Sequence, residues 1–106
     1  MITVTLLGRI TSMKEITATQ NGTKVLNFSV ANERYNGKEN VSDFFNVVAW
    51  SGTAVFISSH FKVGKLIMIT GTLINDNYEK DGVKYYSQKI VAFQVDFAGY
   101  NKSDFC

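Results

Sequence analysis

Most of this 106-residue chain alternates apolar with polar side chains at a period of two, and this pattern constrains the fold most strongly. Successive side chains of a β-strand point to opposite faces, so the pattern predicts strands that bury one face. In one run, Leu26, Phe28 and Val30 alternate with Asn27 and Ser29. Strand-like runs cover residues 2–10, 24–35, 42–50, 65–75 and 85–97. The sequence therefore predicts a protein built mainly from strands.

Dipeptides that favour tight turns separate several of these runs. Asn21-Gly22 and Asn36-Gly37 lie on either side of the second run, and Asp81-Gly82 precedes the last one. Asn-Gly and Asp-Gly are strong hairpin signals because both residues tolerate positive φ. Hairpins are therefore expected at these positions.

The alternation fails in one segment, SGTAVFISSHFKVG, at residues 51–64. Apolar residues recur there near the helical spacing, which predicts a short helix. Ser51 or Thr53 is expected to cap its N-terminus by accepting a backbone N–H, and Gly64 is expected to end it.

Five strands with one helix between the third and fourth, in about 100 residues, match the OB-fold, a partly open five-stranded barrel. An immunoglobulin-like sandwich needs about seven strands and no helix. Gly8 and Gly71 lie inside strand-like runs, as expected where barrel strands bend sharply. We therefore expect an all-β OB-fold domain over residues 1–98 and a short C-terminal extension over residues 99–106.

Composition argues against several functional classes. The formal net charge is only +2, and no apolar run approaches the ~20 residues that cross a bilayer. The single cysteine, Cys106, is terminal, and His60 is its only conceivable catalytic partner. Carboxylates and glycines show no metal-binding or phosphate-loop spacing. We expect no enzymatic activity, no metal and no cofactor, and a reducing, cytoplasmic setting.

The stretch SDFFNVVAWSG, residues 42–52, places aromatic rings on one strand. Phe44, Asn46 and Trp50 lie on one face of the strand. Phe45 lies on the other face, which is predicted to be buried. Two flat rings beside an amide suit neither a core nor a solvated surface. Two alternatives stay open: Trp50 could pack against the helix start, and Phe45 could be core or a subunit contact. The rings predicted to be core are Phe28, Phe93 and Phe97.

Extended ligands cross an OB-fold over strands two and three and the flanking loops. Other rings of this chain lie near that path, and each has a cation beside it in the sequence. Every base has a flat π-face, so an exposed ring gains ~1–3 kcal/mol by stacking on it, while cations follow the phosphates. Only one of the neighbouring Tyr85 and Tyr86 can face the ligand. This pattern predicts a nucleic acid strand as the ligand. The predicted binding residues are Arg9, Arg34, Tyr35, Phe44, Asn46, Trp50, Tyr78, Lys80, Lys84 and Tyr86.

The order and spacing of several motifs resemble the bacterial and phage single-stranded DNA-binding protein family over residues 1–98. The motifs are VTLLGRIT, NGTKVLNFSVANER, DFFNVVAWSGTA, FKVGKLIMITGTL and YEKDGVKYY. The resemblance implies a homo-oligomer, a tetramer before a dimer, around which single-stranded DNA wraps without strict sequence preference. It also implies stacking rings at Phe44, Trp50 and Tyr78, and near Tyr35. It further implies roles in replication, recombination and repair.

The chain departs from the family pattern at several points. The family's long acidic tail, which recruits replication and repair enzymes, has no counterpart in GYNKSDFC, so such recruitment is not expected. The chain is either a short phage- or plasmid-type member or a trimmed core. Where related proteins often place basic residues, this chain has Ile74 and Asp76, and only one of the expected rings is tryptophan. Fewer cations predict a shallower salt dependence and moderate affinity.

An alternative hypothesis is an OB-fold that binds proteins, such as a primosome-type scaffold. Its rings would then be interface anchors, where aromatic residues are also enriched. Low net charge favours this alternative, and the spread of rings over strands and a loop disfavours it. Binding that weakens steeply with salt would separate the two hypotheses. A preference for DNA over RNA rests on the family resemblance alone.

Overall fold

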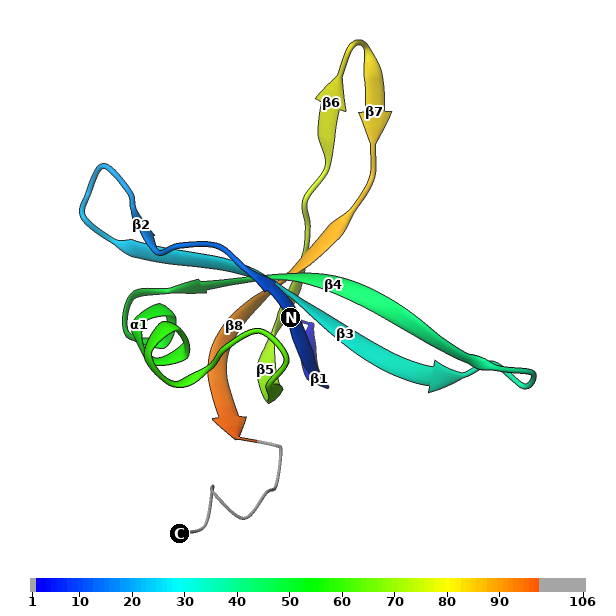
Figure 1. Ribbon diagram of the computed structural model, residues 1–106. Coiled ribbons are helices and arrows are strands. Elements are labelled where there is room, and N and C mark those ends of the chain that lie inside the picture. The colour runs from blue at the N-terminus through cyan, green and yellow to red at the C-terminus, as the bar shows by residue number, and fades with distance from the viewer. Residues whose placement is uncertain (1, 98–106) are drawn as a thin grey trace, which may run out of the picture.

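The computed structural model describes residues 2–97, which form eight strands and one helix (Figure 1). The elements are β1 (Thr3–Met13), β2 (Thr17–Ala18), β3 (Lys24–Tyr35), β4 (Asn40–Trp50), α1 (Ser51–His60), β5 (Leu66–Asn75), β6 (Tyr78–Lys80), β7 (Val83–Tyr85) and β8 (Gln88–Phe97). The predicted extension at 99–106, with Cys106, lies outside the described residues.

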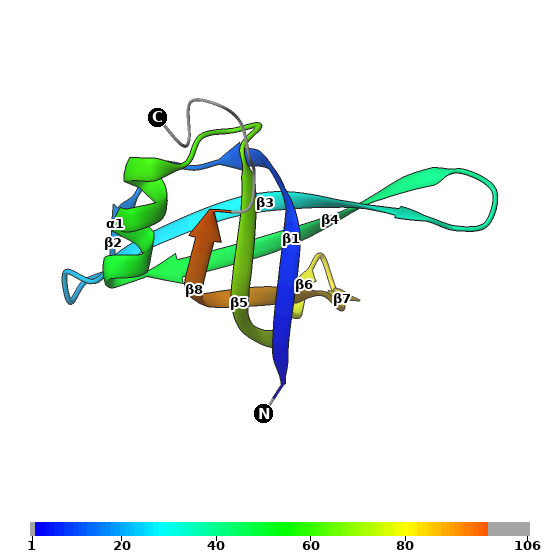
Figure 2. The ribbon, with the colours of Figure 1, turned by 90° about the horizontal axis from the view of Figure 1, so that it is seen from below.

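Five of these strands close into a barrel. The sheet runs in the order β1-β5-β8-β4-β3-β2, and a further pairing of β1 with β3 closes its five long strands. All pairs are antiparallel except β4 with β8. The helix α1 connects β4 to β5 and lies beside the end of the barrel (Figure 2). The predicted OB-fold, with one helix between its third and fourth barrel strands, is confirmed.

Two strand pairs project from the barrel. The β3–β4 hairpin continues well past it as a long arm, and the short β6–β7 hairpin forms a separate two-stranded sheet (Figures 1 and 2). Asp81 and Gly82, which connect β6 to β7, both have positive φ, at 54° and 79°. The hairpin predicted at this dipeptide is confirmed, because such a two-residue turn needs this backbone conformation.

Inward-facing aliphatic and aromatic side chains fill the barrel, and the buried face of α1 covers its end. Alternation predicts most of this core, because Leu26, Phe28 and Val30 on β3 all point inward. The buried cluster comprises Leu6, Ile10, Leu26, Phe28, Val30, Val47, Ala49, Ala54, Ile57, Phe61, Ile67, Ile69, Ile90 and Ala92.

The prediction that Phe93 and Phe97 belong to the core is wrong. They are 55% and 53% exposed. The β5–β8 ladder shifts register between Thr70 and Gly71. Thr70 pairs with Gln94, but the next residue, Gly71, pairs with Ala92, so Phe93 has no partner on β5. Such a bulge interrupts the alternation on which the prediction rested. Phe97 lies at the end of β8, where its ring stacks on Phe61 with centroids 4.9 Å apart.

The helix exists, but its predicted ends are wrong. It begins at Ser51 with Trp50 as the N-cap, and no side chain caps it. Ser51 lies inside the helix with φ at 53°, so its hydroxyl is not at the capping position. The helix ends at His60, where Phe61 donates its N–H to the Ile57 carbonyl oxygen, and Gly64 lies in the following turn.

Candidate nucleic-acid interface

The outward face of β4 carries the predicted row of Phe44, Asn46 and Trp50. In the β3–β4 register these residues pair with Ala31, Ser29 and Val25. Phe44 is 68% exposed and Trp50 is 42% exposed. Trp50 is therefore not part of the buried core, and it directly precedes the helix as its N-cap residue. Phe45, on the opposite face, is also partly exposed.

The β3–β4 arm extends this row. Tyr35 ends β3, pairs with Asn40 and is 67% exposed. Because paired residues of antiparallel strands point to the same side, Tyr35 and Phe44 share one face of the arm. Tyr35, Phe44 and Trp50 therefore lie on one face of the β3–β4 pair, and the buried Val48 separates Asn46 from Trp50 on that face.

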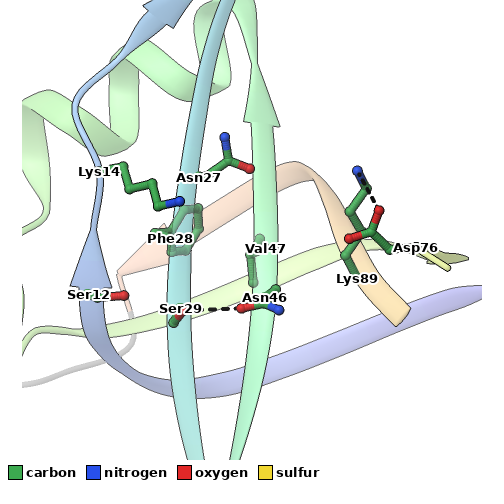
Figure 3. Close-up of a pocket in the computed structure, with 9 residues that line it drawn as sticks. All are labelled: Ser12, Lys14, Asn27, Phe28, Ser29, Asn46, Val47, Asp76 and Lys89. Atoms are coloured by element: carbon green, nitrogen blue, oxygen red, sulfur yellow. Dashed lines mark hydrogen bonds and ion pairs between the residues drawn. The ribbon is translucent and has the colours of Figure 1, made fainter. Parts of the chain in front are cut away.

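A polar groove lies at Asn46, between Phe44 and Trp50 in the β4 sequence (Figure 3). Its volume is about 250 Å³. Ser29 donates its hydroxyl to Asn46 Oδ1 at 3.3 Å, which orients the Asn46 amide within the groove. The lining residues are Ser12, Lys14, Asn27, Phe28, Ser29, Asn46, Val47, Asp76 and Lys89. The groove thus combines hydrogen-bonding groups with charged residues at its rim.

The β6–β7 hairpin contributes a second group of rings. Tyr78 pairs with Tyr85, and their rings stack with centroids 5.0 Å apart and planes at 13°. Tyr86 is 75% exposed. A hollow of about 350 Å³ lies among these tyrosines, Glu79 and Lys84. The hairpin therefore presents flat rings to solvent beside a lysine.

Sequence reasoning chose Tyr86 and missed Tyr85 as the partner of Tyr78. The signal was present, because pairing outward from the two-residue turn at Asp81-Gly82 matches Lys80 with Val83 and then Tyr78 with Tyr85. Lys80 shares a face with Tyr78, whereas Lys84 pairs with Glu79 on the other face. The cations of this hairpin are therefore divided between its two faces.

The two predicted arginines lie in different environments. Arg9 pairs with Ala31, which pairs in turn with Phe44, so Arg9 and Phe44 lie on the same outward row. Its Nη1 donates to the Gly64 carbonyl oxygen at 3.0 Å. Arg34 lies on the opposite face of the arm from Phe44, where its Nε forms an ion pair with Asp43. The structure therefore brings Arg9, but not Arg34, into the aromatic row.

His60 has the surroundings of a helix-surface histidine. Its ring stacks on Phe56 with centroids 4.4 Å apart, and its Nδ1 lies 3.0 Å from the Phe56 carbonyl oxygen. Within residues 2–97, no three His, Cys, Asp or Glu side chains are grouped so that they could hold a metal ion. The helix in this part of the chain is too short and too polar to span a membrane.

An OB-fold barrel with exposed rings along its ligand-binding strands is typical of proteins that bind oligonucleotides or oligosaccharides. The family model described as "Single-strand binding protein family" matches residues 1–98. The protein belongs to this family.

Individual relatives agree with this assignment. The chain is 37% identical over 92 residues to "Single-stranded DNA-binding protein 2" of Streptococcus agalactiae, covering 84% of this chain and 70% of the relative. It is 35% identical over 97 residues to the Aquifex aeolicus "Single-stranded DNA-binding protein", covering 87% of this chain and 66% of the relative. The solved structure "Plasmodium falciparum SSB complex with ssDNA" superposes with a TM-score of 0.78 at 19% identity, covering 91% of each chain, and supports the fold.

Proposed function

We propose that this protein binds single-stranded DNA without strict sequence preference and coats it during replication, recombination and repair. Its role is binding and not catalysis. The observation that carries the proposal is the single outward row of Tyr35, Phe44 and Trp50 beside the polar groove. Unpaired bases expose flat faces that such rings can stack on, whatever the base. Membership of the single-strand binding protein family supports the same function.

Each part of the proposed interface has its own role. Phe44, Trp50, Tyr35, Tyr78 and Tyr86 stack on bases. Asn46 offers hydrogen bonds from the groove. Phosphate contacts come from cations near the rings. Arg34 lies on the opposite face of the arm, so it would have to leave Asp43 and reach around the arm to join them. The cations near the rings are Arg9, Lys80 and Lys84, and Lys14 and Lys89 line the groove.

Titration with poly(dT) tests the proposal directly. Trp50 is the only tryptophan, so its emission reports on this surface alone, and stacking on a base is expected to change it. Unchanged emission together with no mobility shift would contradict the proposal.

Single substitutions then test the rings. Phe44→Ala and Trp50→Ala are each expected to weaken binding of labelled oligo(dT) about five- to a hundredfold, because one stacked base contributes ~1–3 kcal/mol. Phe93→Ala is the matched control, since Phe93 is also an exposed ring but lies on β8 beside α1. Circular dichroism checks that each variant is folded. Loss of the fold in either test variant would assign that ring to the core instead.

We further propose that the protein acts as a homo-oligomer, a tetramer before a dimer, in the cytoplasm of a bacterial or phage-infected cell. The barrel offers a surface for self-association. Within residues 2–97, β1 pairs with β3 only from Arg9 onward, and Asn32 Nδ2 donates to the Leu7 carbonyl oxygen. The edge at Thr3–Leu6 therefore lacks a neighbouring strand on that side, and such an edge favours pairing with another copy.

A further inference from the structure

The groove beside Asn46 contains an acidic residue, which is unexpected where a polyanion is proposed to bind. Three of its nine lining residues carry a charge: Lys14, Asp76 and Lys89. The Asp76 carboxylate lies 3.6 Å from Lys89 Nζ, and both side chains are partly exposed. Figure 3 shows the pair together on one side of the groove, opposite Lys14. One of the two lysines is thus already paired with an acid of the same chain.

Hydrogen bonds hold the backbone of Asp76 in place. Its N–H donates to the Ser87 carbonyl oxygen at 2.8 Å, and the Ser87 hydroxyl donates to the Asp76 carbonyl oxygen at 2.7 Å. Ser87 also donates its N–H to Asn77 Oδ1 at 3.1 Å. These bonds join the two chain segments at the base of the β6–β7 hairpin. The carboxylate is therefore carried by a hydrogen-bonded segment between β5 and β6 and not by a loose loop.

We propose that Asp76 limits the affinity of the groove for nucleic acid by holding Lys89 in an internal ion pair. This inference rests on the proposed function, because it assumes that a DNA phosphate competes for Lys89. A phosphate that approaches Lys89 must displace the carboxylate or accept its repulsion. Asp76 thereby reduces the contribution of Lys89 to phosphate neutralisation, and the protein binds more weakly than its lysines alone would allow.

The substitution Asp76→Asn removes the charge and keeps the shape of the side chain. It is expected to tighten binding of oligo(dT) about two- to fivefold at low salt, the range that an exposed ion pair supports. Lys89 would then neutralise one more phosphate, so the slope of log K against log[salt] should become more negative by about 0.7. A merely structural role of Asp76 would not steepen this slope.

Asp96→Asn is the matched control. It changes the net charge by the same amount. Asp96 is exposed and lies near the C-terminal end of β8, whereas Lys89 lies near the N-terminal end of that strand. It is expected to leave the slope unchanged. Equal tightening by both variants would overturn the proposal, because it would show a general effect of net charge.

A double mutant tests whether Asp76 acts through Lys89. In a Lys89→Met background, Asp76→Asn is expected to have little effect on affinity or slope, and full tightening there would overturn the proposal. The wild-type titration separates this inference from the proposed function. If wild-type protein does not bind oligo(dT), the function itself fails. If wild-type protein binds and Asp76→Asn behaves like wild type, only the role of Asp76 fails.

Discussion

Only one side of the Tyr78 ring is open to the stacking proposed above, because Tyr85 covers the other side at a centroid distance of 5.0 Å. We therefore expect Tyr85 to act as a positioning residue. A single exposed ring on a short hairpin can rotate freely, and fixing it lowers the entropy that is lost when a base stacks on it. Stacked aromatic pairs contribute about 0.5–1.5 kcal/mol beyond the area they bury, which is enough to restrict a ring at the surface.

We expect Tyr85→Ala to weaken oligo(dT) binding about two- to tenfold, through lost orientation of Tyr78. Tyr85→Phe should restore nearly full affinity, because it keeps the stacked ring and lacks only the hydroxyl. In a Tyr78→Ala background, Tyr85→Ala should add little. A full additional loss in that background would show that Tyr85 contacts DNA by itself.

Residue parity explains which of the residues proposed to bind share a face. Phe44, Asn46 and Trp50 lie on one face because β4 is regular from Asn40 to Trp50, so counting by two is reliable there. Adjacency in sequence associates Arg34 with Tyr35, yet adjacent strand residues point to opposite faces. The ion pair of Arg34 with Asp43 was not predictable, because it depends on the register of β3 against β4.

At the scale of elements, the β5–β8 pair bends at a bulge beside Gly71. A Cβ at Gly71 would overlap with the Val91 carbonyl group, so only glycine allows β8 to approach β5 this closely. The alternation of β8 could not reveal this bulge, because one extra residue changes the parity of every residue beyond it. For this reason alternation alone predicts a buried Phe93, whereas the side chain is exposed.

Gly71→Ala is expected to lower the free energy of unfolding by about 1–3 kcal/mol, because the methyl group forces the two strands apart. Urea denaturation, followed by circular dichroism, measures this change. Gly52→Ala is the control, since no atom lies within 4 Å of its added Cβ and Gly52 is inside α1. It should be neutral or stabilise the protein by about 0.5–1 kcal/mol. Equal destabilisation by both variants would contradict this account of the bulge.

At the scale of the whole molecule, the fold could be predicted from the number and order of the elements. Few architectures accommodate five strands and one helix in this length, so the OB-fold followed without knowledge of the strand pairing. The long β3–β4 arm and the stacked tyrosines of the β6–β7 hairpin were not predicted. Both depend on how far two paired strands continue beyond the other strands of the sheet. Alternation along a single strand does not specify this length.

The unpaired edge of β1 allows a test of self-association. Leu7 is half-exposed on the outward face of β1, beside the Thr3–Leu6 edge. A charged residue at such an edge opposes pairing with another copy. If this edge forms the interface, Leu7→Glu should lower the oligomer mass while the circular dichroism spectrum stays that of the folded protein.

Sedimentation equilibrium at micromolar concentration measures the mass. The wild-type protein is expected to sediment as a multiple of its 11.9 kDa chain, a tetramer before a dimer. Val55→Glu is the control, because Val55 is an exposed apolar residue on α1 and not on β1. A monomeric wild-type protein would contradict self-association altogether. An oligomer that persists in Leu7→Glu but dissociates in Val55→Glu would move the interface from the β1 edge to the helix.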